Sequence, residues 1–171
     1  NEYKREIEKF IIKNKPYVIA LNTQVKINKK LIDLYVACNP LKVMAEANQY
    51  KNIKSPLAAP ISLLSEQVKK KLKKIKIFNF GVGLKEGSFK FYNSCANIPK
   101  LYTLAYALSI AASGKSKKIY LAGFDGYQKN DRRIKIINEI FQNYLVTKGA
   151  TPLTAVTPTV YNIQKKSIYT L

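Results

Sequence analysis

Short apolar runs alternate with helical stretches along the whole chain, and turn-forming residues separate the two kinds of segment. The runs at 17–22, 34–39, 117–126 and 151–158 are largely apolar, which is typical of strands buried on both faces of a sheet. The stretch 130–149 places its hydrophobic residues on one helical face. Because repeated strand–helix–strand units form doubly wound sheets, we predict an α/β fold: a Rossmann-like three-layer sandwich with a mostly parallel sheet.

The ends of several helices can be predicted from single residues. Pro40 suits the first turn of a helix, and Ser94 and Asn97 can cap the buried, alanine-rich helix that follows them. Asn130 or Asp131 can cap the last long helix. The other predicted elements are helices over 2–13, 40–50, 61–75 and 98–114, strands over 55–60 and 75–81, an edge strand over 167–171 and a loose glycine-rich segment over 81–87.

The length of 171 residues and the hydrophobic content of 47% suit one α/β domain, 1–171, with a sizeable core. No apolar run approaches the roughly 20 residues needed to cross a bilayer. The amino-terminal residues lack the apolar centre of a signal peptide and a starting methionine. We therefore expect a cytoplasmic location, no transmembrane segment, and a chain that is the C-terminal part of a longer protein.

The two cysteines and the lack of histidine limit which disulfides, metal sites and catalytic pairs this chain can form. Cys38 and Cys95 lie far apart without CxxC spacing, and the sequence contains no histidine. A disulfide scaffold, a usual zinc site and a Ser/His or Cys/His catalytic pair are thereby excluded or made improbable. We predict no metal site, and no cofactor is evident.

The net charge of +20 raises the question of a nucleic-acid partner. Of the 30 basic residues, only Arg5, Arg132 and Arg133 are arginines. Proteins that read grooves or stack on bases rely on arginine, whereas this chain is rich in lysine together with isoleucine, asparagine and tyrosine. The scarcity of arginine therefore argues against nucleic acid as the partner, and a solvated lysine-rich surface is the simpler interpretation.

Polar residues follow the predicted parallel strands at the edge where doubly wound sheets bind ligands. Asp125, between two glycines, can hold a ribose or sugar hydroxyl, or it can cap a turn or the next helix. The phosphate-binding patterns GxGxxG and GxxxxGK[ST] are absent. The candidate ligand-binding residues are Asn22, Asn39, Pro40, Ser94, Asp125, Tyr127, Thr157, Thr159 and Tyr161; no catalytic residue is assigned.

Several motifs resemble a family of bacterial sialyltransferases and related proteins of surface-polysaccharide assembly. They are "FYNSC" before an alanine-rich helix, "KKIYLAGFDGYQ" and "TAVTPTVYNI", with "VIALNTQ" and "LYVACNP" upstream. A closer likeness is to the C-terminal module behind the HMG-CoA-lyase-like, or 4-hydroxy-2-oxovalerate-type, aldolase domain of some O-antigen and capsule proteins. The resemblance implies a Rossmann-like fold, a CMP-type nucleotide or nucleotide-sugar ligand, and contacts from Asn22, Asn39, Ser94, Asp125 and Tyr127.

Two features of that family have no counterpart here. Its first strand and the Gly-x-Gly-Pro-Ser loop would lie just before Asn1, and the histidine that its transferases use as a general base is absent. We therefore expect a nucleotide- or sugar-binding accessory module of a lipopolysaccharide or capsule biosynthesis protein, partnered by an N-terminal domain of the same chain that carries out the chemistry. The alternatives are a sialyltransferase-like glycosyltransferase and a basic nucleic-acid-binding domain.

Overall fold

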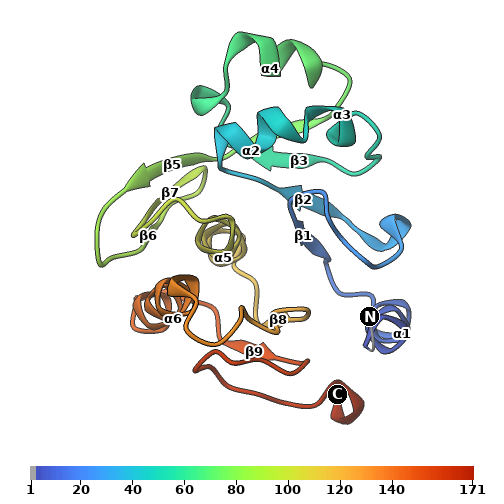
Figure 1. The fold of residues 1–171 in the computed structure, drawn as a ribbon, viewed down its shortest axis with the longest axis vertical. Coiled ribbons are helices and arrows are strands. Elements are labelled where there is room, and N and C mark those ends of the chain that lie inside the picture. Colours follow the sequence, from blue (N-terminus) through green and yellow to red (C-terminus); the bar gives the residue numbers. More distant parts are fainter. Residues whose placement is uncertain (1–2) are drawn as a thin grey trace.

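The computed structural model describes residues 3–171 and shows a mixed α/β fold of helices and mostly parallel sheets (Figure 1). The helices are α1 (Lys4–Asn14), α2 (Pro40–Ala45), α3 (Ala47–Tyr50), α4 (Glu66–Lys71), α5 (Thr103–Ser113) and α6 (Arg132–Leu145), with short 3-10 turns η1 (Lys29–Leu31), η2 (Ile61–Leu63) and η3 (Ile168–Thr170). The strands are β1 (Ile19–Leu21), β2 (Leu34–Val36), β3 (Leu57–Ala59), β4 (Ile77–Asn79), β5 (Gly81–Leu84), β6 (Lys90–Phe91), β7 (Cys95–Ile98), β8 (Ile119–Leu121) and β9 (Leu153–Ala155).

The nine strands form three sheets. Sheet A is parallel throughout, in the order β1-β2-β3-β4. Sheet B has the order β5-β7-β6, with β5 parallel and β6 antiparallel to β7. Sheet C is the parallel pair β8-β9. The predicted Rossmann-like arrangement is therefore confirmed, although its strands do not form one continuous sheet.

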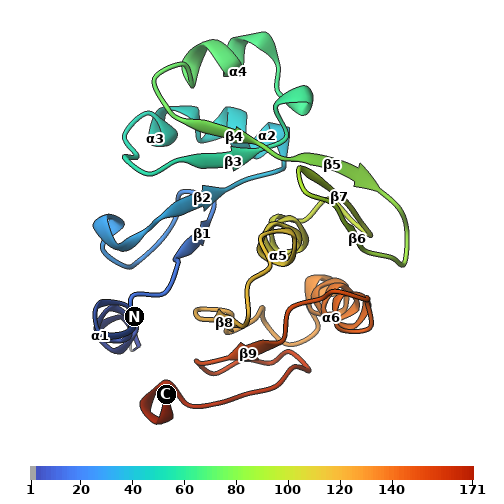
Figure 2. The same ribbon diagram turned by 180° about the vertical axis from the view of Figure 1, so that it is seen from behind.

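Helices cover both faces of sheet A, as a three-layer fold requires. On one face, the core contains residues of α2, α3 and α4 packed on inward residues of β1 to β3. On the other face, a larger core joins α5 and α6 to residues of all three sheets. Figure 2 shows α2, α3 and α4 on the far side of sheet A from α5.

Local sequence explains how several helices begin and end. The Asn39 side chain accepts hydrogen bonds from the backbone amides of the first turn of α2, and Pro40 occupies the first helical position, as predicted. Asp131 caps α6. Gly114 follows α5, which is apolar on almost every side and mostly buried. The predicted stripe Leu64, Val68 and Leu72 is also buried, but it extends beyond the short helix α4 at both ends.

Three local predictions were wrong. Ser94 and Asn97 do not cap the buried helix, because Cys95–Ile98 form strand β7 and the helix begins only at Thr103. The glycine-rich segment over 81–87 is not a loose loop throughout, since Gly81–Leu84 form β5. The predicted edge strand at 167–171 is instead the 3-10 turn η3, and pairing with β9 occurs just before it, as a parallel bridge from Ala155 to Lys165.

The helix predicted over 2–13 corresponds to α1, and Glu2 lies outside the described residues. Among the described residues, no helix is both long enough and apolar enough to span a membrane.

Candidate ligand-binding site

Asn22 lies directly after β1, at the carboxyl edge of sheet A. Its backbone is in the left-handed region, with φ 59°, which asparagine tolerates better than most residues. Its side-chain Oδ1 accepts a hydrogen bond from Oγ1 of Thr103, at 3.4 Å. Thr103 is the first residue of α5, so this contact places the amino end of α5 beside the carboxyl end of β1.

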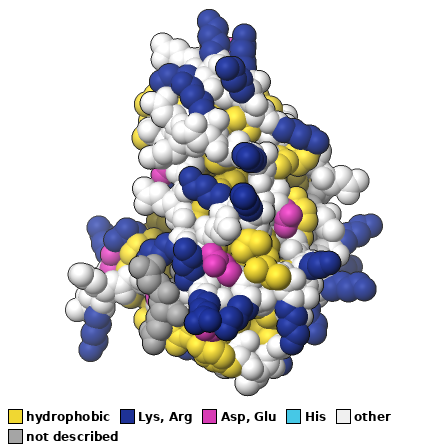
Figure 3. Space-filling view, turned by 90° about the vertical axis from the view of Figure 1, so that its right-hand side faces the viewer, with side chains coloured by type: hydrophobic (Ala, Val, Ile, Leu, Met, Phe, Trp, Pro, Cys, Tyr) yellow, Lys and Arg dark blue, Asp and Glu magenta, His cyan; other side chains and the backbone are white. Residues whose placement is uncertain are grey.

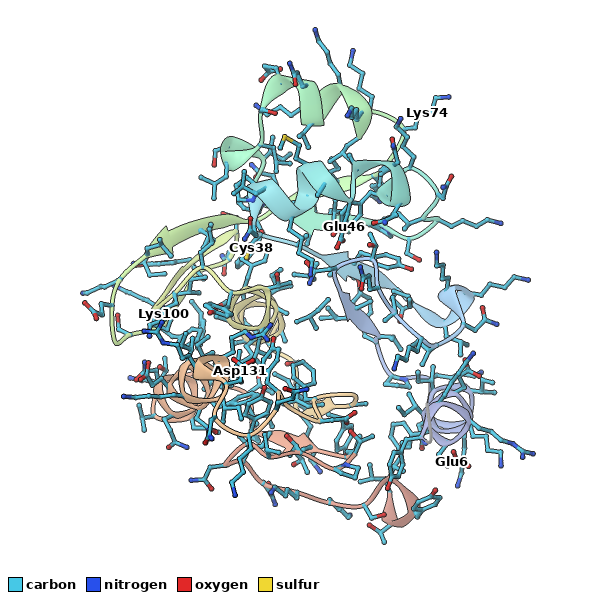
Figure 4. All side chains as sticks on the ribbon, viewed as in Figure 1. Glu6, Cys38, Glu46, Lys74, Lys100 and Asp131 are labelled. Carbon is cyan, nitrogen blue, oxygen red and sulfur yellow. The ribbon has the colours of Figure 1, made fainter. Side chains whose placement is uncertain are left out.

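Cys38 follows β2 and lies beside the same threonine. Its Sγ is 4.0 Å from Oγ1 of Thr103, and its side chain is fully buried between sheet A and α5 (Figure 4). Burial raises the pKa of the Cys38 thiol to about 11, against the smaller opposing effect of the Thr103 contact. The thiol is therefore protonated at neutral pH and is not an activated nucleophile.

Asn39 and Pro40 occupy the end of β2 and the start of α2. Oδ1 of Asn39 accepts hydrogen bonds from the amides of Leu41 at 3.0 Å and Lys42 at 3.3 Å. The side chain is exposed, but its oxygen already has a structural role in capping α2. We call Asn22, Cys38, Asn39 and Thr103 the sheet A cluster.

A buried carboxylate holds the loop that follows Asn22. Oε2 of Glu46 accepts hydrogen bonds from the hydroxyl of Thr23 at 2.7 Å and from its backbone amide at 3.3 Å. The Thr23 hydroxyl is also 3.0 Å from Oε1 of Gln49. Glu46 lies near the junction of α2 and α3, labelled in Figure 4, so these helices position the residue next to Asn22.

At the carboxyl end of sheet C, two hydrogen bonds from backbone amides join the loops that follow β8 and β9. The amide of Gly123 donates to Oγ1 of Thr157 at 3.0 Å, and the amide of Val160 donates to the carbonyl of Asp125 at 3.2 Å. Thr159 lies in the same loop, where its Oγ1 accepts from the amide of Tyr161. We call Gly123, Asp125, Thr157 and Thr159 the sheet C cluster.

The structure corrects the predicted place of Asp125. β8 ends at Leu121, so Asp125 does not end the strand but lies in the loop beyond it. Its side chain is exposed, and α6 is capped by Asp131 instead. Among residues 3–171, we find no hydrogen bond or ion pair made by the Asp125 carboxylate. Its side chain is therefore available to a ligand.

Tyr127 and Tyr161 have different environments. The guanidinium of Arg133 stacks over the exposed ring of Tyr127, 3.8 Å from its centre, and pairs with Asp131 at 2.6 Å. Tyr161 is only 3% exposed, and its ring packs against Phe141. Burial raises the pKa of Tyr161, which is the wrong direction for a general base at neutral pH.

Ser94 does not join either cluster through the described contacts. It is an exposed residue before β7, and its carbonyl accepts a hydrogen bond from the amide of Gly81 at 2.8 Å. Ser94 is also too far along the chain from the buried helix to cap it, because that helix begins nine residues later, at Thr103.

A surface hollow of about 920 Å³ lies along α6, and no residue of either cluster lines it. Its lining includes Glu86, Lys100 and Asn143, and the ion pair between Lys100 and Glu139, at 2.7 Å, crosses this region. Lys100 and Asp131 are labelled in Figure 4 on the α6 side of the molecule. None of the predicted ligand residues lines this hollow, so the carboxyl edge of the sheets is the stronger candidate site.

Within the described part of the chain, no three His, Cys, Asp or Glu side chains are grouped closely enough to hold a metal ion. Comparison with models of protein families, with curated proteins and with solved structures found no match to this chain.

Proposed function

We propose that this chain is a cytoplasmic nucleotide- or sugar-binding accessory module of a bacterial surface-polysaccharide biosynthesis protein, with the chemistry carried out by another domain, such as an aldolase. The observation that carries the proposal is the hydrogen bond between Asn22 and Thr103 at the carboxyl edge of sheet A. In open α/β sheets, ligands bind at this edge. The likeness of the "VIALNTQ", "LYVACNP" and "LAGFDGY" motifs to sialyltransferase-like modules supports the choice of ligand class.

The chemistry of the two clusters suits hydroxyl-rich ligands. The amide of Asn22 and the hydroxyl of Thr103 can exchange hydrogen bonds with a ribose or a base, and the free carboxylate of Asp125 can accept from sugar hydroxyls. The first turn of α5 has no side-chain cap among the described residues, so no side-chain oxygen competes with a phosphate for its amides. A CMP-type nucleotide has all three kinds of partner group.

Ionisable groups at this edge favour binding over catalysis. Burial raises the pKa of both Cys38 and Tyr161, so neither supplies a base at neutral pH. The sequence contains no histidine. The sialyltransferase-like alternative would therefore depend on the exposed carboxylate of Asp125, the one acidic group that both lies in a cluster and is unpaired among the described residues.

The net charge of +20 supports the nucleic-acid alternative. On the face drawn in Figure 3, Lys and Arg side chains are spread from one end of the molecule to the other. A spread of this kind solvates a surface and attracts polyanions without sequence preference, and such attraction weakens steeply with salt.

The test is thermal unfolding of the chain with CMP, UMP and CMP-sialic acid, for the parent and for Thr103→Val. We expect CMP at 100 times its Kd to stabilise the parent by about 2.7 kcal/mol, which corresponds to a rise in Tm of several degrees. Thr103→Val keeps the shape of the side chain and removes its hydroxyl, so it should reduce this rise. Thr154→Val, on β9 and outside both clusters, is the matched control and should retain it.

Three outcomes separate the alternatives. No rise in Tm with any of these ligands, or an equal rise in Thr103→Val and the parent, would contradict the proposed site. Release of free sialic acid from CMP-sialic acid, lost in Asp125→Asn, would favour the glycosyltransferase. Retention of a single-stranded oligonucleotide at physiological salt would favour the nucleic-acid-binding domain.

A further inference from the structure

Two strand edges face each other without pairing. β1 is one of the two edge strands of sheet A and β8 is one of the two strands of sheet C, and within residues 3–171 neither has a strand partner on its second edge. Figures 1 and 2, which view the molecule from opposite sides, both show the ribbons of β1 and β8 as the neighbouring edges of sheets A and C. We call the interval between these two strand edges the β1–β8 gap.

The strands on either side of the gap run in the same direction. The contact between Asn22 and Thr103 places the amino end of α5 at the carboxyl end of β1. The other end of α5 leads, through residues 114–118, to the amino end of β8. The amino ends of β1 and β8 therefore lie at the same level, and the two strands are parallel.

The hydrogen bonds of β1 show which of its backbone groups face the gap. The carbonyl of Val18 accepts from the amide of Leu34 at 3.1 Å, and the amide of Asn22 donates to the carbonyl of Val36 at 2.9 Å. Both groups therefore point toward β2. Because backbone groups alternate between the two edges of a strand, those of Ile19 and Leu21 point into the gap.

The same reasoning applies to β8. The amide of Ile119 donates to the carbonyl of Pro152 at 2.8 Å, and the carbonyl of Leu121 accepts from the amide of Val156 at 2.9 Å. Both groups point toward β9, so the amide and carbonyl of Tyr120 point into the gap. The two edges thus present backbone donors and acceptors toward each other.

Helices close the gap on both faces. On one face, α5 packs against β1 and β2, and its residues share a core with Leu121 of β8. On the other face lies α1, whose Phe10 makes an edge-to-face contact with Tyr120, with ring centres 5.8 Å apart. The gap therefore has the surroundings of a central strand position in a three-layer sandwich.

Burial is incomplete around this position. β2 has neighbours on both edges and buries all three of its residues, whereas β1 buries only Ala20 and β8 only Leu121. α1 has a hydrophobic stripe that includes Ile7 and Phe10, yet it has no buried residue. Apolar side chains on three sides of the gap thus remain partly exposed, although each belongs to an element with a core-facing pattern.

We propose that the β1–β8 gap takes an apolar β-strand, parallel to both edges and joined to the amino end of α1. α1 connects to β1 through residues 15–18 only and covers the face of the gap. Parallel neighbours need a crossover connection, usually a helix packed on the sheet. α1 has the place and the connection of such a crossover helix between a strand in the gap and β1.

An inserted strand would join sheets A and C into one sheet. Its carboxyl end would lie between the sheet A cluster and the sheet C cluster, so the loop from that strand to α1 would add backbone groups to the centre of this edge. The inference rests on backbone topology and holds whether or not the edge binds a nucleotide.

The test is to extend the chain before Asn1 with the strand Lys-Val-Ile-Val-Ile followed by the loop Gly-Asn-Gly-Ser. The matched control is Lys-Pro-Ile-Pro-Ile with the same loop, because proline removes the amides that a central strand needs. Amide hydrogen exchange reports on the edges directly. In the strand extension, the amides of Ile19, Leu21 and Tyr120 should exchange roughly 100-fold more slowly than in the proline control, and Tm should rise.

Four other outcomes of the exchange experiment would each contradict the proposal. Equal exchange rates in the two extensions would show that the gap does not accept a strand. Slow exchange of the three amides in the parent chain as a monomer would show that β1 and β8 already pair. The same protection from the unattached synthetic strand at equal concentration would assign the gap to a partner chain, and protection that accompanies dimerisation of the parent would assign it to a second copy.

Discussion

Glu46 and Thr23 are joined by two hydrogen bonds, with Oε2 of Glu46 2.7 Å from the threonine hydroxyl and 3.3 Å from its backbone nitrogen. Both residues are buried. The pair links the junction of α2 and α3 to the loop after β1, and Thr23 immediately follows the candidate ligand residue Asn22.

We expect Glu46→Ala to lower the free energy of unfolding by about 1–3 kcal/mol, because it leaves a buried amide without an acceptor. Urea unfolding measures the change. Glu86→Ala, at an exposed position, is the control and should have little effect. A double-mutant cycle with Thr23→Val should show coupling between the two residues; additive effects would mean that the pair does not interact.

Two buried tyrosines should respond oppositely to loss of their hydroxyls. The Tyr106 hydroxyl donates to the carbonyl of Phe80, so Tyr106→Phe leaves that acceptor unpaired and should cost about 1–3 kcal/mol. The Tyr35 hydroxyl is buried and has no hydrogen-bond partner among the described residues. Tyr35→Phe should therefore be neutral or stabilising in thermal unfolding, and equal losses in both variants would contradict this assignment.

Both the backbone angle of Gly126 and the space around it disfavour a larger residue. Its φ is +111°, and a Cβ there would overlap the side chain of Val160. Gly87 also has a positive φ, at +65°, but a Cβ there meets nothing within 4 Å. Gly126→Ala should therefore be more destabilising than Gly87→Ala, which carries only the backbone cost of about 1–2 kcal/mol.

Removal of the Val160 side chain checks the steric part of this prediction. Val160→Ala should recover part of the stability lost in Gly126→Ala and none of that lost in Gly87→Ala. If Gly126→Ala and Gly87→Ala unfold at the same denaturant concentration, the loops of the sheet C cluster are not packed as described.

The stability that the Asp131 cap gives to α6 should be lost at acid pH. Hydrogen bonds from Arg133 hold the pKa of Asp131 below its ordinary value of 3.8. A lowered folded-state pKa stabilises the protein above the unfolded value, and this contribution is lost as the pH falls through the folded-state value. Asp131→Ala should therefore be less stable than the parent at neutral pH, with a difference that narrows only below about pH 4.

Asp131→Asn separates the cap from the charge. Asparagine keeps the acceptor for the amide of Arg133 but cannot form the ion pair. Its loss of stability at neutral pH should be smaller than that of Asp131→Ala, as measured by urea unfolding across the pH range. An identical loss in the two variants would assign the whole effect to the ion pair.

The two cysteines should differ in reactivity. Cys38 is fully buried, and its pKa is raised to about 11, whereas Cys95 is partly exposed. A thiol reagent at pH 8 should therefore modify Cys95 in the folded protein and Cys38 only after unfolding, as mass spectrometry of the modified peptides would show. Modification of Cys38 in the folded state would contradict its position between sheet A and α5.

The apolar runs and helical stripes were sufficient to predict most of sheets A and C and the long helices. Sheet B was missed, because β5 is half glycine and β7 was read as part of a helix cap. Glycines in β5 let the strands approach closely: a Cβ on Gly81 would be 3.0 Å from Cβ of Cys95. Such pairing depends on a partner elsewhere in the chain, which local propensity does not reveal.

The candidate site was predicted in part. The rule that ligands bind at the carboxyl ends of strands pointed to Asn22, Asn39 and the loop around Asp125, which the structure places at that edge. Thr103 was missed because it lies 81 positions from Asn22 and within a stretch read only as a buried helix. Tyr161 was predicted to be a ligand-binding residue, but its ring is buried and packs against Phe141.

Each strand of sheets A and C has three residues, so both sheets are only about 10 Å deep. In so short a strand, one face receives two side chains and the other receives one. In β1, for example, Ala20 alone faces the core beneath α2, α3 and α4. A single inserted or deleted residue would move every following side chain to the opposite face of the sheet. In a strand of three residues, too few side chains would then remain on the correct face to hold the strand in place. Insertions in this protein should therefore be tolerated in its loops and almost nowhere within these strands.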